Sequence, residues 1–285
     1  MGVHDPSGVT EPTSIQPVRI TDPADERLAD YRQLRDPAAR RRIEGDELFI
    51  AEGPLAIERL LESSHPVRSL LLSEDKYERM APRLGQLVTP PVVFVTSRPL
   101  LGEIVGFDLH RGAIAAAGRL PLPSLGELLR GARRVAVLEG LNDPENLGAV
   151  ARSARALGVD ALVLDPTCID PYARRTVRVS MGEILLLPFT RVAAGEWPAG
   201  ALAAIGDAGF ETWALTPAAD ADDVWQLPVP ERLALVLGAE GPGLSGPVMA
   251  GAGRRVRIPI SPEVDSLNVG AAAAVAFAIA ARPAG

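Results

Sequence analysis

The sequence predicts an α/β protein with two globular domains, the second of which is built around a mostly parallel β-sheet. Short apolar runs alternate with helical patterns along the chain, and a proline-bearing stretch separates two such series. In the second series the runs are nearly continuous in valine, leucine and isoleucine, which is typical of parallel strands covered on both faces. A chain of 285 residues, 47% of them hydrophobic, suffices for two full cores.

The first part of the chain predicts a tail followed by a small domain. Residues 1–20 are polar and contain prolines, so we expect a mobile tail. Residues 21–118 are predicted to form a small α/β domain, which begins with a charged helical stretch over 25–42. Its strands are expected at 48–51, 67–72, 92–95 and 113–117, and its further helices at 54–63 and 76–84.

Residues 119–131, with Pro121 and Pro123, are predicted to be a linker that holds a short helix near 125–130. The second domain is then expected over residues 132–285. Its strands are predicted at 134–138, 161–164, 184–187, 211–215, 233–237 and 255–258, with helices between them. In such sheets ligands bind beyond the carboxyl ends of the strands.

The charge balance gives mixed indications about partners. The formal net charge of −7 argues against a nonspecific nucleic-acid binder, because such proteins usually carry a basic surplus. However, Lys76 is the only lysine, and arginines cluster at 40–42, 174–178 and 254–257. Arginine forks suit phosphate. A GC-rich coding sequence would also explain the preference for arginine over lysine. The arginine clusters alone therefore do not decide whether the protein binds nucleic acid.

Several kinds of site and location are disfavoured. The lone Cys168 cannot form an internal disulfide, and residues 1–20 lack the apolar core of a signal peptide, so we expect a cytoplasmic protein. The longest apolar run, 269–281, is too short to span a bilayer and predicts a buried helix without membrane contact. Three scattered histidines disfavour a histidine-built metal site, and no G-x-G-x-x-G follows an early strand.

Two loops that follow predicted strands are candidates for binding a ligand. Residues 238–243, Gly-Ala-Glu-Gly-Pro-Gly, allow a ligand to approach the backbone closely, and Glu240 favours a neutral or cationic ligand over phosphate. Residues 142–152 read as a loop followed by a helix that carries Asn146 and Arg152. Each loop alone also fits a plain structural turn, with Asn142 or Asp143 as a helix N-cap.

A third loop precedes the apolar helix. Ser266 is a candidate N-cap of this helix, which would place Asn268 inside the first turn of an otherwise apolar element. A buried asparagine there would need a hydrogen-bond partner. The loop follows the strand end Ile258-Pro259-Ile260, so three strand-to-loop-to-helix junctions suggest one composite site.

Together, N-D-P-E-N-L-G-A-V-A-R (142–152), L-G-A-E-G-P-G-L-S (237–245) and I-P-I-S-P-E-V-D-S-L-N-V (258–269) resemble the motifs of the SpoU (TrmH-like) RNA 2'-O-ribose methyltransferases of the SPOUT superfamily. The match runs from about Arg133 to Ala281. Residues 49–54 and 110–115 are similar to parts of the ribosomal-protein-like substrate-binding domain that often precedes this catalytic domain.

The resemblance implies a deep trefoil knot at the carboxyl end of the catalytic domain, which general topology rules disfavour. It also implies a homodimer and S-adenosylmethionine as methyl donor. The cofactor would be held largely by main-chain groups. The residues implied in its binding are Leu237, Gly238, Gly243, Ile258, Ile260 and Leu267.

The resemblance also implies a catalytic centre made of Asn146, Arg152, Glu240, Ser266 and Asn268. Because a guanidinium stays protonated in almost any protein environment, we expect Arg152 to grip a phosphate and stabilise the developing alkoxide rather than act as a base. Candidates for contacts to the RNA are arginines of both domains: Arg41, Arg42, Arg68, Arg111, Arg174 and Arg178.

The expected reaction is transfer of a methyl group to a ribose 2'-hydroxyl of RNA, with ribosomal RNA as the favoured substrate and transfer RNA as the alternative. The same active site would also serve self-protection against an antibiotic. A noncatalytic RNA-binding or ribosome-assembly factor is a different alternative, against which the presence of Asn146, Arg152, Glu240 and Asn268 argues. No metal is expected to take part.

Overall fold

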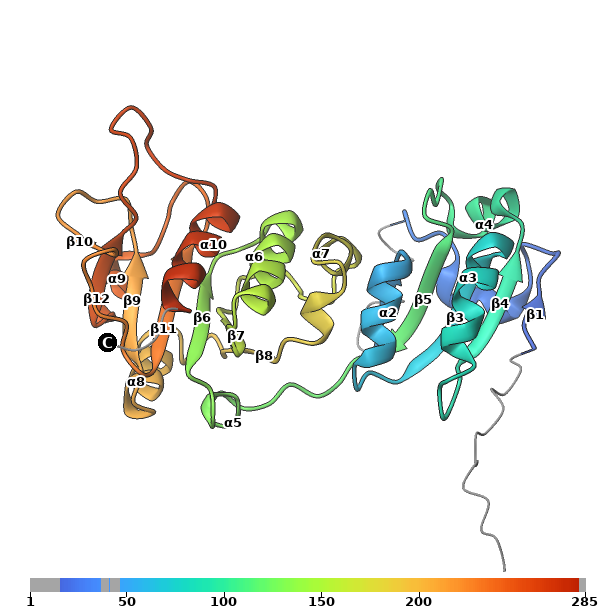
Figure 1. Cartoon of the computed structure of the whole chain (residues 1–285), viewed down its shortest axis with the longest axis horizontal. Helices are drawn as coiled ribbons and strands as arrows, with labels where there is room; N and C mark the ends of the chain where they lie inside the picture. Colours follow the sequence, from blue (N-terminus) through green and yellow to red (C-terminus); the bar gives the residue numbers. More distant parts are fainter. Residues whose placement is uncertain (1–15, 37–40, 42–46, 282–285) are drawn as a thin grey trace, which may run out of the picture. The chain divides into compact units, whose positions relative to one another are not determined.

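A computed structural model describes residues 16–36, 41 and 47–281 (Figure 1). The chain divides into two compact units. One contains the described residues up to 48 together with 66–118, and the other contains 49–65 together with the described residues from 119 onward. Strands and helices alternate in both units, as the sequence patterns predict.

A mixed five-stranded sheet has the order β1-β4-β3-β5-β2. β3 pairs in parallel with β4 and antiparallel with β5, and β1 pairs in parallel with β4. The strands are β1 (Val18–Arg19), β2 (Leu48–Glu52), β3 (Val67–Ser73), β4 (Val92–Thr96) and β5 (Ala113–Gly118). The helices that lie between these strands along the chain are η1 (Glu26–Tyr31), α2 (Pro54–Glu62), α3 (Glu74–Leu84) and α4 (Arg98–Val105).

The start of the described chain is tied into this sheet. Val18 and Arg19 form β1, and Ile20 is 4% exposed, so the tail expected over residues 1–20 is ordered at its end. The rest of that expected tail, residues 1–15, lies outside the described residues. Of the charged stretch expected over 25–42, residues 26–31 form a 3-10 helix. The buried Tyr31 hydroxyl fixes this helix to β3 by donating to the Ser69 carbonyl at 2.8 Å.

A seven-stranded sheet has the order β10-β12-β9-β11-β6-β7-β8, and each pair of neighbouring strands in it is parallel. This confirms the mostly parallel sheet that the sequence predicts. The strands are β6 (Arg134–Glu139), β7 (Ala161–Leu164), β8 (Phe189–Arg191), β9 (Glu211–Leu215), β10 (Asp222–Asp223), β11 (Leu233–Gly238) and β12 (Arg254–Arg257).

Helices lie over both faces of this sheet. The helices and helical turns are α5 (Leu125–Leu129), α6 (Pro144–Ala156), α7 (Arg174–Val179), η2 (Glu183–Leu185), α8 (Ala199–Asp207), α9 (Gly246–Gly251) and α10 (Val269–Ala280). α10 packs against α6 and β11, while α8 packs against α5, α9 and β9 (Figure 1).

The pleat of the strands explains the core. Val135, Val163 and Val236 belong to a buried cluster with residues of α5, α8 and α9, so they face one side of the sheet. Ala136, Leu164 and Leu237, which follow these three valines in the chain, are also buried. Because successive side chains point to opposite faces, strands covered on both sides need apolar residues at every position, which accounts for the nearly continuous runs.

One predicted strand is wrong. The apolar run at 184–187 forms the 3-10 turn η2 and its exit, and the strand β8 begins at Phe189 instead. Gly182 has φ +83° and immediately precedes this turn. A short apolar run has the same composition in a buried turn as in a buried strand, so periodicity cannot separate the two.

Within the ranges that the structure describes, no helix is long and apolar enough to cross a membrane. The apolar run at 269–281 is the largely buried helix α10, as predicted.

Candidate active site

The carboxyl ends of the central strands meet at one edge of the parallel sheet. Glu139, the last residue of β6, is paired with Gly238, the last residue of β11, and Leu215 of β9 is paired with Val256 of β12. The loops that leave these strands therefore start beside one another. This juxtaposition brings together the three loops that the sequence singles out.

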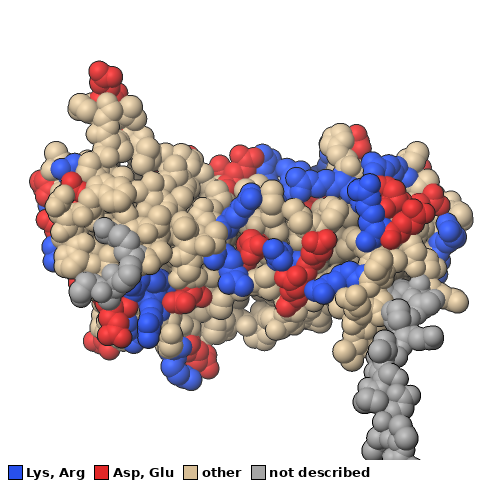
Figure 2. All heavy atoms as spheres, in the orientation of Figure 1, with Lys and Arg blue, Asp and Glu red and all other residues tan. Residues whose placement is uncertain are grey.

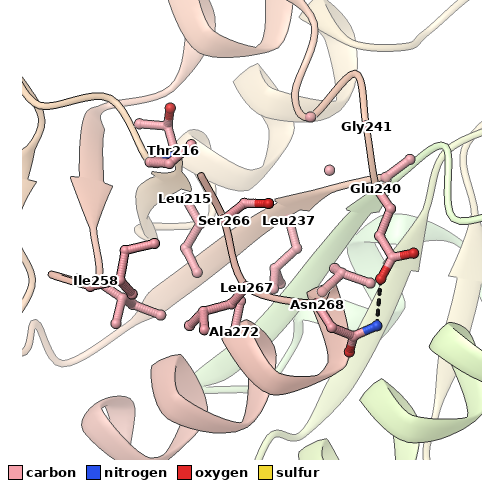
Figure 3. A pocket seen from close by; sticks show the side chains of 16 residues that line it. Leu215, Thr216, Leu237, Glu240, Gly241, Ile258, Ser266, Leu267, Asn268 and Ala272 are labelled. Carbon is pink, nitrogen blue, oxygen red and sulfur yellow. Dashed lines mark hydrogen bonds between the residues drawn. The ribbon is translucent and has the colours of Figure 1, made fainter. Parts of the chain in front are cut away.

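A pocket of about 430 Å³ lies at this edge (Figure 3). All six residues expected to bind the cofactor, Leu237, Gly238, Gly243, Ile258, Ile260 and Leu267, line it. Of the residues expected at the catalytic centre, Glu240, Ser266 and Asn268 also line it, whereas Asn146 and Arg152 do not.

Aliphatic side chains and backbone form most of the pocket wall. In Figure 3 the side chains of Leu215 at the end of β9, Ile258 just after β12 and Leu267 just before α10 converge on the same space. Such a wall suits a flat apolar ring whose polar edge meets main-chain groups.

Gly238 is required by the way the next loop folds back. A Cβ atom at Gly238 would lie 2.3 Å from the carbonyl carbon of Gly243 and 2.5 Å from its oxygen. The Gly243 amide donates to the Ala239 carbonyl at 3.0 Å, which closes the loop on itself. Any side chain at position 238 would push this loop out of place.

The Asn268 carboxamide lies at the centre of a polar cluster. Its Oδ1 accepts hydrogen bonds from the amides of Gly270 at 2.9 Å and Ala271 at 3.2 Å, so Asn268 is the N-cap of α10. Its Nδ2 donates to Asn146 Oδ1 at 3.0 Å and to Glu240 Oε1, as the dashed line in Figure 3 shows for Glu240. All these contacts fix which way the amide points.

This arrangement corrects one detail of the sequence interpretation. Asn268 does not lie inside the first turn of the helix, and Ser266 is not its cap. Asn268 caps the helix with its oxygen and uses its nitrogen for Asn146 and Glu240. One residue thus performs both roles, whereas the sequence suggests a separate residue for each.

The helix α6 carries the remaining two candidates. Asp143 is its N-cap, accepting from the Glu145 amide at 2.8 Å, and Pro144 is in the first turn. Asn146 follows in that turn. Arg152 lies less than two turns further on and is exposed. Among the described residues, its guanidinium has no hydrogen bond or ion pair, so it is available for an anionic ligand.

Three of the other predicted arginines already contact carboxylates. Arg174 donates to the buried Glu52 carboxylate at 2.6 Å, and Arg178 approaches the same carboxylate at 3.4 Å. Arg68 forms an ion pair of 3.5 Å with Asp30. Both Arg41 and Arg111 are exposed. Arg42 lies outside the described residues.

The sequence interpretation missed part of the pocket. The lining residues that no motif contains are Leu215, the last residue of β9, Thr216 and Pro217, which follow it, and Ala272 of α10. The strand β9 was predicted, and its place beside β11 brings its carboxyl end to the same edge. Its loop has no glycine-rich or amide-rich signature, so the sequence alone does not single it out.

Two further observations concern the chemistry of this part of the molecule. Burial, together with the nearby Asp165, raises the pKa of the Cys168 thiol to about 12, so this thiol is a poor nucleophile. Within the described ranges, no group of three or more histidine, cysteine, aspartate or glutamate side chains could hold a metal ion.

Comparison with known proteins agrees with this geometry. Residues 133–278 match the model of the SpoU rRNA Methylase family. A Mycobacterium tuberculosis protein described as an uncharacterized tRNA/rRNA methyltransferase is 42% identical over 262 residues, which cover 90% of this chain and 89% of that protein.

Solved structures share the fold. An AdoMet-bound rRNA methyltransferase from Sinorhizobium meliloti superposes with a TM-score of 0.75 at 23% identity, covering 92% of this chain and 96% of that one. A structure described as an RNA 2'-O ribose methyltransferase superposes with a TM-score of 0.71 at 28% identity, covering 92% of this chain and 98% of the other.

Proposed function

Because this chain belongs to the SpoU rRNA methylase family, we propose that it transfers a methyl group from S-adenosylmethionine to a ribose 2'-hydroxyl of RNA, with ribosomal RNA as the substrate. The observation that carries the proposal is the pocket at the carboxyl edge of the parallel sheet, with Asn268 at its rim donating hydrogen bonds to both Asn146 and Glu240. Its relatives include tRNA/rRNA methyltransferases and an RNA 2'-O ribose methyltransferase.

The residues of the pocket fit this cofactor. Aliphatic side chains from β9, the loop after β12 and the start of α10 offer a surface for the adenine ring, and the backbone after β11 offers polar groups for its edge. The Glu240 carboxylate lies on the pocket wall and favours a positively charged ligand. When bound, S-adenosylmethionine supplies a methyl group on a cationic sulfur.

Asn268 keeps the polar cluster in one arrangement. Its amide holds the Glu240 carboxylate and the Asn146 oxygen toward a common point, while its own oxygen is fixed on the amides that begin α10. Preorganised groups of this kind align reactants without moving during the reaction.

Arg152 is proposed to hold the RNA phosphate next to the target ribose. Its guanidinium remains protonated at any physiological pH, so it cannot accept the proton of the 2'-hydroxyl. As a fixed cation it stabilises the negative charge that develops on the 2'-oxygen, and the proton leaves to phosphate or water. Its exposure and lack of a partner among the described residues support this role.

The two parts of the chain would divide the work. We assign recognition of the RNA to residues 21–118, with Arg41, Arg42, Arg68 and Arg111 as candidate contacts, and catalysis to residues 132–285, joined by a linker over 119–131. On α7, the side chain of Arg178 is 43% exposed, against 22% for Arg174, so Arg178 is better placed for phosphate while Arg174 neutralises Glu52.

We further propose a homodimer that works in the cytoplasm, where its RNA substrate is found. α10 is apolar around its whole circumference, including the exposed Ala271 and Ala278. Figure 2 shows few charged side chains over α10 on the face in view. An exposed apolar surface of this kind is typical of an interface, and a second copy of the chain would remove it from water. The trefoil knot remains a prediction of the family resemblance.

The test is transfer of labelled methyl from S-adenosylmethionine to RNA prepared from cells that lack this gene, followed by nuclease digestion and nucleoside mass spectrometry. A labelled 2'-O-methylnucleoside in ribosomal RNA is the expected product. Label found only in transfer RNA would mean that transfer RNA, and not ribosomal RNA, is the substrate. Cofactor binding without label in any RNA, assembling ribosomal particles included, would favour the noncatalytic RNA-binding alternative.

A further inference from the structure

The carboxylate of Glu139, the last residue of β6, is held by donors from two other elements. Its Oε1 accepts from the Ser245 hydroxyl at 2.8 Å and from the Trp197 indole nitrogen at 3.2 Å. Its Oε2 accepts from the Ser245 backbone amide at 2.8 Å. Neither the sequence motifs nor the pocket lining includes Glu139.

These contacts fix both ends of the loop that carries Glu240. At its start, Gly238 is paired with Glu139 in the sheet. At its end, Ser245 is bound to the same Glu139 through its amide and its hydroxyl. Between them the loop is closed by the bridge of Ala239 to Gly243. A single residue of β6 therefore lies beside the first residue of this loop and is hydrogen-bonded to its last.

The chemistry of the contacts requires a carboxylate. Ser245 Oγ accepts from the Val248 amide at 3.4 Å as the N-cap of α9, so its own proton points to Glu139. The indole and amide hydrogens also point to Glu139. Three donors thus meet two acceptor oxygens. In a glutamine, the NH2 group would replace one of these oxygens and would face one of the three donors, so that two donors would point at each other.

From this arrangement we propose that Glu139 is a positioning residue, which acts through Ser245 to hold the 238–245 loop, and with it Glu240, against the cofactor pocket. The inference rests on the proposed methyltransferase function. Glu139 touches neither cofactor nor substrate in this role. Its loss lets the loop relax away from the pocket wall, which weakens cofactor binding and displaces Glu240 from Asn268.

The experiment compares Glu139→Gln with the wild-type protein in cofactor titration by calorimetry, methyl transfer and thermal unfolding. We expect the cofactor Kd to rise about tenfold, as for the loss of one charge-assisted hydrogen bond. Glu139→Asp, which keeps both acceptor oxygens, should recover part of the affinity. Because Ser245 transmits the effect, Ser245→Ala should weaken binding, and the double variant should lose less than the sum of the two.

Glu211→Gln is the matched control. Glu211 also accepts from an indole, Trp213 Nε1 at 2.7 Å, but it lies at the opposite end of the sheet, at the first residue of β9. The Glu211→Gln substitution should lower the unfolding temperature without changing the cofactor Kd. The positioning role is overturned if Glu139→Gln binds cofactor like the wild type, or if Glu211→Gln weakens binding equally. If the wild-type protein binds no cofactor, the proposed function itself fails, which is a separate outcome.

Discussion

Asn268 shows how one side chain can serve stability and function with different atoms. Its oxygen caps α10, and its nitrogen organises Glu240 and Asn146. An N-cap contributes about 1 kcal/mol to the stability of a helix, and several side chains would serve. Only an uncharged amide provides both an acceptor for the helix and two donors for the carboxyl and amide oxygens of its neighbours.

Asn268→Asp should separate the two roles. Aspartate caps helices well, so the free energy of unfolding should change by less than about 1 kcal/mol. Its second oxygen, however, would face Glu240 as a like charge, and methyl transfer should fall by roughly a hundredfold. Urea unfolding and initial rates measure the two effects. A large loss of stability with unchanged activity would contradict this division.

Arg152→Ala should abolish methyl transfer, with a loss on the order of 10²-fold or more, and leave the affinity for S-adenosylmethionine nearly unchanged. Arg155→Ala provides the control, because Arg155 is an exposed arginine of the same helix that lies 3.9 Å from Glu183. Binding and rate are measured for both variants. A large loss of cofactor binding in Arg152→Ala would show that the arginine serves the cofactor instead of the RNA.

Cys168 should make the protein sensitive to alkali. Its pKa is raised to about 12 by burial, whereas an unfolded thiol titrates near its ordinary value of 9.0. Above pH 9 the unfolded chain therefore releases a proton that the folded chain keeps. Stability present below pH 9 is lost as pH rises toward 12, by at most about 1.4 kcal/mol per pH unit.

The measurement is urea unfolding under reducing conditions at pH 8, 9 and 10. Cys168→Ala should show a shallower loss of stability between pH 9 and 10 than the wild type. Tyr31 and Tyr172 contribute to the remaining slope, because burial raises the pKa of both phenols as well. An unchanged slope in Cys168→Ala would mean that the thiol is accessible in the folded protein.

Among the elements, α6 depends on close packing against α7. A Cβ atom at Gly148 would lie 2.7 Å from Val179 Cβ and 3.0 Å from the Thr176 carbonyl oxygen. This glycine lets the helix that carries Asn146 and Arg152 approach α7, although glycine inside a helix costs about 1 kcal/mol relative to alanine. The packing of α6 against α7 must therefore stabilise the protein by more than this loss of helix propensity.

Gly148→Ala should therefore destabilise the protein by about 1–3 kcal/mol, because overpacking exceeds the gain in helix propensity. Gly206→Ala in α8 is the control, since nothing lies within 4 Å of the position of its Cβ atom, and it should be neutral or slightly stabilising. Chemical denaturation of both variants measures the difference. Equal effects would show that α6 can move away from α7 without penalty.

The accuracy of the sequence predictions also differs among elements. Nearly continuous apolar runs, such as those of α10 and β11, lie where the sequence places them. The run at 184–187 does not form a strand, because its packing is decided by the turn at Gly182 and not by composition. Local sequence patterns predict the strands and helices of the core. They do not predict whether a short apolar run such as 184–187 forms a strand or a buried turn.

At the scale of the whole molecule, the three motifs correctly indicate the family and contain most of the residues that line the pocket. They succeed because Gly238, Glu240 and Asn268 belong to loops with unusual composition at one sheet edge. The contributions of Thr216 and Glu139 depend on strand order, which places β9 and β6 on either side of β11. Strand order is a property of the folded chain, and no local signal in the sequence encodes it.

The proposed homodimer belongs to this scale. Light scattering should give a mass near twice the 30.0 kDa of one chain. Ala278→Glu, on the exposed face of α10, should shift the protein toward the monomer, because a buried unpaired charge is costly. Ala203→Glu on α8 places the same charge on an exposed alanine elsewhere and should leave the mass unchanged. A wild-type mass near one chain would refute the dimer.

The hydrogen bond from Trp197 to Glu139 gives the molecule an intrinsic optical signal. Trp213 is buried and Trp225 is half exposed, and neither is bonded to Glu139. Indole emission responds to the charge and hydrogen bonding around the ring. Movement of the 238–245 loop should therefore alter the emission of Trp197, and the filling of the pocket can be followed by stopped-flow fluorescence without attaching any dye.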